Sequence, residues 1–240
     1  MNIDYGWKSS ALDHALAEGH REACGCVVVV KGREKYFPCK NIAPTNESIF
    51  IMDPDDFSRC SDAGEITAIF HSHPKSPAQP SIADQMGCEQ SGVKWWICNP
   101  GLNTWCSLEP NGFKAPLIGR SWIWAVSDCW TLARDWYKEE LDLDLKDWER
   151  PLSAEEFQKK PTFEKSFKDT GFVNRGIQIP EYGDLVLMSL DGSTGLNHCA
   201  VYIGDQLILH HLRSRLSSRD VYGGYYQKST GLIVRHQSRL

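Results

Sequence analysis

The chain has 240 residues, of which 41% are hydrophobic and 24% are charged, a composition typical of a folded globular protein. Its net charge of -5 argues against a nucleic-acid binder, because such proteins need a basic face to displace counterions. The sequence has no apolar run of about 18 residues, and residues 1–10 are polar, so we expect neither a membrane span nor a secretory signal. These features leave an enzyme, a binding module or a structural protein, made and folded in a cytoplasm.

Cysteine usage agrees with that compartment. The chain contains nine cysteines, an odd number that argues against a disulfide framework. The absence of a CxxC pair also argues against a Cys-rich zinc ribbon. Cys24 and Cys26 could be a pair of metal ligands, but they run directly into residues 27–30, which are all valine. We therefore interpret this segment mainly as a strand.

The N-terminal half is predicted to alternate helices and strands. Alanine and leucine recur at helical spacing over residues 9–19, which predicts a helix ended by Gly19. A second helix is expected from Ser81 to about Gly92. We expect strands, bounded by turn residues, over residues 24–30, 35–39, 49–52, 66–73, 95–98 and 104–108, with 112–114 completing a closing hairpin.

The C-terminal half follows a break over residues 114–120, which contains a proline and a glycine. We place a domain boundary there, which divides the chain into residues 1–114 and 115–240. A helix is expected over residues 129–140, and the charged stretch 141–170 is expected to be helical in two pieces. Strands are then predicted over residues 184–190, 199–203, 206–211 and 232–235.

A possible metal site lies at the end of the strand expected over residues 66–73. His71 and His73 are two residues apart, so the period of a strand places both imidazoles on one face. Asp84, in the first turn of the next helix, can add a carboxylate oxygen. Two nitrogens and one oxygen leave a fourth position for water, as in a catalytic zinc site. Glu22, at the start of an early strand, is the best candidate for the base.

Each part of this pattern has an ordinary structural explanation. Ser81 and Asp84 form a capping box, which usually marks only a helix start, and a lone His-x-His is weak. The conjunction of His-x-His, seven residues, Ser, two residues and Asp, with Glu22 upstream, resembles the signature of the JAMM/MPN metalloproteases over residues 8–112. The resemblance implies that His71, His73 and Asp84 bind Zn²⁺, that Glu22 is the general base, and that Ser81 stabilises the tetrahedral oxyanion.

A possible nucleophile lies at the start of the second long helix. Asp128 can cap this helix, and Cys129 falls in its first turn, where free N–H groups and the helix dipole favour the thiolate. For an isolated cysteine, a buried place on an apolar helix face would be the better interpretation. The thiol therefore needs a histidine partner to count as a catalytic candidate.

Two histidines are candidates for that partnership. Residues 197–210 indicate two strands around a turn near Gly204. If the turn centres there, His198 and His210 are directly opposed, with their side chains close together. His210 could then hold His198 in one tautomer while His198 activates Cys129. His211 would point to the other face, which makes it the weaker candidate.

The C-terminal half resembles the NlpC/P60 cysteine peptidases over residues 118–240. The matching pieces are Cys129 after Asp128, residues 182–186, and His198 with residues 200–204 after it. His210 falls where that family has its third polar residue, whereas Trp130 stands where the family usually has a small one. The resemblance implies a papain-like fold and, as substrate, the stem peptides of peptidoglycan, cut next to D-glutamate and diaminopimelate.

The two resemblances together predict an α+β protein of two domains. A JAMM/MPN-like (cytidine-deaminase-like) α/β/α domain precedes a papain-like NlpC/P60 domain. This order resembles the tail tip proteins of lambda-type tailed phages. It implies a peptidase made in the host cytoplasm, placed at the tail tip of the virion, with other tail tip proteins as partners and peptidoglycan peptides as substrate.

Two rival interpretations stay open. The chain could be a structural tail protein or assembly factor whose sites are vestigial or plugged, although every catalytic position in both halves is filled. Alternatively, the JAMM-like half could be a processing protease for a tail protein, with only the second half acting on cell wall. A deubiquitinating role is disfavoured, because the second domain points to a bacterial wall substrate.

Overall fold

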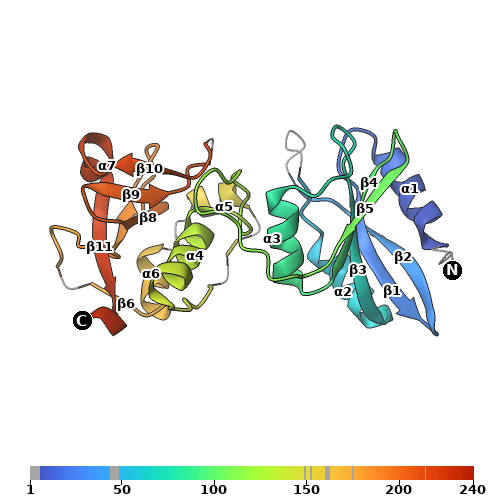
Figure 1. The fold of residues 1–240 in the computed structure, drawn as a ribbon, viewed down its shortest axis with the longest axis horizontal. Coiled ribbons are helices and arrows are strands. Elements are labelled where there is room, and N and C mark those ends of the chain that lie inside the picture. Colours follow the sequence, from blue (N-terminus) through green and yellow to red (C-terminus); the bar gives the residue numbers. More distant parts are fainter. Residues whose placement is uncertain are drawn as a thin grey trace. The chain divides into compact units, whose positions relative to one another are not determined.

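The computed structural model describes residues 6–43, 49–148, 150–151, 153–159, 163–174, 176–213 and 215–240. The chain divides into two compact units, Met1–Lys114 and Ala115–Leu240, and each has its own sheet (Figure 1). Within the described residues, every helix is too short or too polar to cross a membrane.

The N-terminal unit is built on a five-stranded sheet with the order β2-β1-β3-β4-β5. Its elements are α1 Trp7–Glu18, β1 Cys24–Val30, β2 Arg33–Cys39, α2 Pro54–Ala63, β3 Glu65–Ser72, α3 Ile82–Ser91, β4 Lys94–Asn99 and β5 Thr104–Leu108. Neighbouring strands are antiparallel except β3 and β4, which are parallel and are connected through α3. A helical crossover is the usual way to join two parallel strands.

Helices cover both faces of this sheet because β1 and β3 are apolar on both faces. Val27 and Phe70 belong to the core beside α1, whereas Cys26 and Val28 pack with Cys60 of α2 on the opposite face. The α2 face also carries α3, whose Cys88 packs on the sheet (Figure 1). The unit is therefore the predicted α/β/α layering.

The C-terminal unit contains a six-stranded antiparallel sheet with the order β10-β9-β8-β7-β11-β6. Its elements are α4 Cys129–Leu141, α5 Ala154–Lys159, α6 Phe163–Asp169, β6 Phe172–Val173, β7 Leu185–Met188, β8 His198–Tyr202, β9 Leu207–His210, β10 Ser218–Val221, α7 Gly224–Ser229, β11 Thr230–His236 and the 3₁₀ helix Gln237–Arg239. The main core lies between α4 and the sheet, where Leu132, Trp136 and Tyr137 meet Val201 and Leu209.

Most of the predicted elements are present, but two expected strands are absent. Residues 49–52 form only a single bridge, Asn41 with Met52, because the Asn41 side chain takes the place of a strand partner. Its amide donates to the carbonyl of Ile49 at 3.1 Å and accepts from the N–H of Ile51 at 3.0 Å. Residues 112–114 are also not a strand.

The closing segment of the N-terminal unit is held by a carboxylate instead. Glu89 Oε1 accepts the N–H groups of Asn111 and Phe113, at 2.6 and 3.1 Å.

Other elements also differ from the prediction. The helix α1 begins at Trp7, two residues before the expected helix start. The strands β6 and β10 and the helix α7 were not predicted, and β10 contributes a residue to one of the candidate sites.

Candidate active sites

The first candidate site gathers three side chains on the α3 side of the N-terminal sheet. His71 lies in β3, His73 follows that strand, and Asp84 lies in the first turn of α3. The Nε2 atoms of the two histidines are 3.0 Å apart. The Asp84 carboxylate places Oδ1 3.1 Å from His71 Nε2 and Oδ2 3.4 Å from His73 Nε2. All three residues are buried, so three ligand atoms converge on one enclosed point.

These separations fit a small tetrahedral cation. Zinc bonds of about 2.0–2.1 Å to nitrogen and oxygen give tetrahedron edges of roughly 3.3 Å. The second ring nitrogen of His73, Nδ1, donates to the carbonyl of Pro77 at 3.0 Å, the kind of contact that orients a ligating imidazole. Phe50 stacks on the His71 ring with centroids 4.8 Å apart. The donor set and its orientation therefore suit Zn²⁺.

Glu22 is the acidic group next to these three residues. It is buried, and burial raises the pKa of its carboxyl, while the charges of His71 and His73 partly oppose that rise. Burial also acts to raise the pKa of Asp84, but hydrogen bonds from the two histidines outweigh it and hold that pKa well below its usual range. The two carboxyl groups therefore differ: Asp84 stays ionised, while Glu22 is suited to carry a proton.

Ser81 both caps α3 and borders this cluster. Its hydroxyl oxygen accepts the N–H of Asp84 at 3.1 Å, and its own N–H donates to Asp84 Oδ2 at 2.6 Å, which completes the capping box. Ser81 is exposed, so its hydroxyl can also donate to a group outside the core. The structural and catalytic interpretations of this serine are thus compatible.

The second candidate site begins at Cys129, the first residue of α4. Asp128 caps this helix by accepting the N–H of Thr131 at 2.9 Å. The hydrogen bond from the Cys199 thiol, and then the hydrogen bond and positive charge of His198, lower the pKa of Cys129 despite the opposing effect of burial. The position and the neighbours of this thiol both favour the thiolate.

A chain of hydrogen bonds leads away from His198 across three strands. His198 Nε2 in β8 is 3.1 Å from His210 Nδ1 in β9. His210 Nε2 is 3.2 Å from Asp220 Oδ2 in β10. Asp220 also accepts from Tyr226 at 2.8 Å and from Arg215 at 3.0 Å. The sequence analysis missed Asp220, although an acidic residue ten positions after His210 is visible in the sequence.

These contacts determine which ring nitrogens carry protons. Burial acts to raise the pKa of Asp220, but hydrogen bonds from Tyr226 and His210 lower it to about 2, so this carboxylate only accepts. His210 Nε2 must then donate to it. Burial, and then the charge of His198, lower the pKa of His210 to about 4, so neutral His210 accepts at Nδ1 from His198 Nε2. This tautomer makes Nδ1 the acceptor nitrogen of the His198 ring.

The predicted register of the β8–β9 hairpin is wrong by two residues. His210 pairs with Ala200, not with His198. A shift of two positions keeps every side chain on its face, so His198 and His210 are diagonal neighbours and still meet. His211 is fully buried and takes no part in this chain of hydrogen bonds.

Trp130 belongs to the core and not to a substrate groove. The side chain is 2% exposed, and its indole N–H donates to Asp147 at 3.0 Å. Its ring packs edge-on against Phe172 of β6. The large residue after the cysteine therefore points away from the thiol site.

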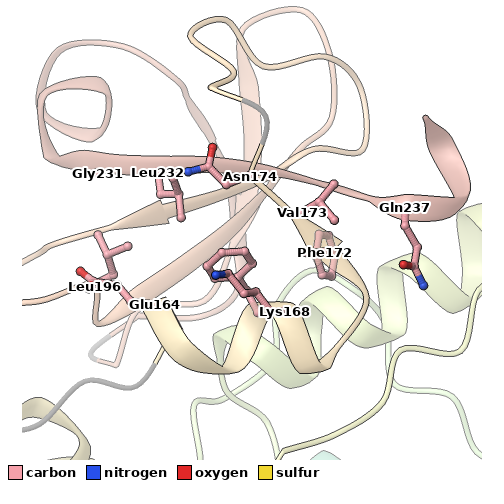
Figure 2. A pocket seen from close by; sticks show the side chains of 10 residues that line it. Glu164, Lys168, Phe172, Val173, Asn174, Leu196, Gly231, Leu232 and Gln237 are labelled. Carbon is pink, nitrogen blue, oxygen red and sulfur yellow. The ribbon is translucent and has the colours of Figure 1, made fainter.

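Two of the hollows lined by described residues lie apart from the candidate side chains. One of about 780 Å³ lies between α6, β6 and β11, and Glu164 and Lys168 line it (Figure 2). None of the candidate catalytic residues borders it. The other, of about 510 Å³, is lined by Pro80 and Gln85, which flank the Ser81–Asp84 segment. Only the second hollow is adjacent in sequence to a candidate site.

The two halves match two known domain families. Residues 6–109 match the family described as prokaryotic homologs of the JAB domain, and residues 119–235 match the NlpC/P60 family. The chain therefore combines a JAB-type domain with an NlpC/P60 domain, which confirms the two predicted domain types and their order.

Two curated relatives match most of the chain. Tail tip assembly protein K of Escherichia phage N15 is 31% identical over 234 residues, which cover 94% of this chain and 92% of the relative. The protein of the same name from Escherichia phage lambda is 31% identical over 189 residues, or 78% of this chain and 90% of the relative. The chain belongs to the tail tip assembly protein K family.

A third relative covers the N-terminal half alone. The probable TtuB-protein conjugate cleaving protease of Thermus thermophilus is 29% identical over 89 residues. These cover 35% of this chain and 60% of that protein.

Proposed function

We propose that this chain is a phage tail tip component whose C-terminal unit is a cysteine endopeptidase for peptidoglycan stem peptides. The hydrogen-bonded series from His198 through His210 to Asp220, beside a thiol at a helix start, carries this proposal. Membership of the NlpC/P60 family supports a peptidase, and the two relatives named tail tip assembly protein K support placement in a phage tail with other tail proteins as partners.

Each residue of the thiol site has a role in the proposed reaction. The Cys129 thiolate attacks the carbonyl carbon of the peptide, forming a carbon–sulfur bond while protonated His198 gives its proton to the departing amine. Water then attacks the acyl group, His198 takes the water proton, and the thiolate leaves. His210 and Asp220 keep His198 in the tautomer that presents Nδ1 to the sulfur.

The N-terminal unit is proposed to be a second, zinc-dependent peptidase site. His71, His73 and Asp84 would hold the ion, which would polarise the substrate carbonyl and acidify water. Glu22, with its raised pKa, accepts a proton from water and delivers it to the leaving amine. Ser81 donates its exposed hydroxyl to the oxyanion.

One experiment tests the thiol-site proposal against its rivals. The whole protein is incubated with purified peptidoglycan, and the released peptides are identified by mass. Cys129→Ala should abolish release, whereas Cys88→Ala, which changes a buried cysteine of α3, should keep it. His73→Ala should also keep it. Release that depends on His73 and not on Cys129 would assign wall cleavage to the N-terminal unit and contradict the thiol-site proposal.

The absence of any released peptide from the wild type would favour the structural assembly factor with plugged sites. The processing-protease alternative predicts a different substrate. Wild type should then cut a protein from the same tail, and His73→Ala should not.

A further inference from the structure

Three thiols gather in the N-terminal unit, away from the groups assigned above. Cys24 pairs with Cys39 across β1 and β2, so Cys26, two residues along β1, shares its face with Cys39 as a diagonal neighbour. The helix α2 lies over this face, and its Cys60 side chain completes the group. All three cysteines are buried, and their sulfur atoms lie within 4.8 Å of one another.

A fourth sulfur borders this group. Cys39 Sγ is 3.6 Å from Cys60 Sγ, and Cys26 Sγ is 3.7 Å from the thioether of Met52. Zinc–sulfur bonds of about 2.3 Å give tetrahedron edges of roughly 3.8 Å, close to both separations. The Cys39–Cys60 separation is also far longer than a disulfide bond of about 2.05 Å. The cysteines are free thiols at the spacing of metal ligands.

We propose that Cys26, Cys39 and Cys60, with Met52 as a fourth neighbour, bind one soft, thiophilic d¹⁰ cation, Zn²⁺ or Cu⁺. Sulfur ligands select these ions over the hard cations that prefer oxygen. The site is closed by α2 and has no donor atom in common with the His71–His73–Asp84 cluster. Binding releases thiol protons and fastens α2 to the sheet. The proposal goes beyond the proposed peptidase function and does not depend on it.

The test uses the full chain with His73→Ala, which disables the other metal cluster. The reduced, metal-free protein is titrated anaerobically with Cd²⁺, and the ultraviolet thiolate-to-cadmium charge-transfer band is followed. The band should saturate at about one equivalent, as for a single closed site. Adding Cys60→Ala should remove it, whereas adding Cys88→Ala should not. Cys60 and Cys88 are matched, because both are buried cysteines on helices of the same unit.

Competition against the bound Cd²⁺ separates the two ions. Met52→Leu keeps all three thiols and removes the thioether. If the site binds copper, this variant should weaken Cu⁺ binding, measured against a Cu⁺ chelator, more than Zn²⁺ binding. Equal, unchanged affinity for both ions would assign the site to zinc. The proposal would be overturned if the His73→Ala protein showed no charge-transfer band. It would also be overturned if Cys60→Ala left the band intact while the circular dichroism spectrum stayed unchanged.

Discussion

His210 pairs with Ala200 across the β8–β9 hairpin, one diagonal step from His198, and the two imidazoles are hydrogen-bonded at 3.1 Å. The same His210 ring contacts Asp220 through its other nitrogen. One imidazole thus connects His198, the proposed base, to a carboxylate on a third strand. The contribution of each of these groups can be measured by substituting it separately.

The first prediction concerns Asp220 as a positioning residue. Asp220→Asn should lower kcat for peptide release by on the order of 10²-fold and leave KM nearly unchanged, because the amide no longer forces the His210 tautomer. Asp220→Glu should restore part of the loss. The pH profile of kcat should also shift in Asp220→Asn, a change that a merely structural role would not produce. Equal kcat in wild type and Asp220→Asn would remove Asp220 from the site.

The second prediction concerns thiol reactivity. The pKa of Cys129 is lowered, so Cys129 should react first with limiting iodoacetamide at neutral pH, read by peptide mass mapping. Burial raises the pKa of Cys88 to about 11, which makes it the slow control. His198→Ala should erase the preference for Cys129, because the His198 charge supports the thiolate. Labelling of Cys129 no faster than Cys88 would contradict the nucleophile assignment.

The third prediction separates metal binding from proton transfer. His73→Ala should lose the metal that binds the His71–His73–Asp84 cluster, as measured by elemental analysis of the purified protein. Glu22→Gln should keep it and lose hydrolysis by this unit, because Glu22 is assigned to the proton and not to coordination. The comparison needs Cys60→Ala in every protein, so that the sulfur cluster adds no metal. Metal loss in Glu22→Gln would make Glu22 a ligand.

The fourth prediction concerns acid stability. Burial lowers the pKa of His211 to about 4, and that of His210 to the same value, from about 6.5 in the unfolded chain. The unfolded state therefore binds protons first as the pH falls. The stability present above pH about 6.5 should decline down to about 4. His211→Gln should flatten this decline in thermal melts, whereas His20→Gln, at an exposed position, should not. Parallel declines would refute the linkage.

The fifth prediction concerns the two units. We propose that residues 1–114 and 115–240 fold independently. Residues 115–120, the first segment of the second unit, are hydrogen-bonded within that unit. Arg120 is fully buried and donates to the carbonyl of Ala115 at 2.7 Å. Proteolysis should therefore cut near the exposed Lys114 and not across residues 115–120, and each piece should show its own melting transition. A single transition in both the intact and the cut chain would show one cooperative unit.

The sequence was most informative where local chemistry decides the structure. The strand before His71 and the capping box of Asp84 follow from periodicity and from side-chain chemistry, and both are present. The hairpin register was not accessible in this way. The sequence predicts a turn centred on Gly204, but Asp205 and Gln206 also adopt positive φ, which moves the centre to Asp205 and shifts the pairing by two residues.

Asp220 and the sulfur cluster were missed for a different reason. The strand β10 is an edge strand of sequence Ser-Arg-Asp-Val, without the apolar alternation that marks a strand. Cys39 and Cys60 lie 21 positions apart, and only the placement of α2 over the β1–β2 face brings them together. Such tertiary contacts leave no periodic trace in a single sequence.

The capping box of α3 has a consequence for how fast an ion can be captured. Asp84 Oδ2 is held by the Ser81 N–H at 2.6 Å as part of the helix start. Its rotamer is fixed when the chain folds, so the proposed ion would meet an aligned carboxylate and would not have to order a mobile side chain. Exchange of that ion would then leave the first turn of α3 intact. Removal of the ion by a chelator would leave a preformed metal-free site that could bind the ion again.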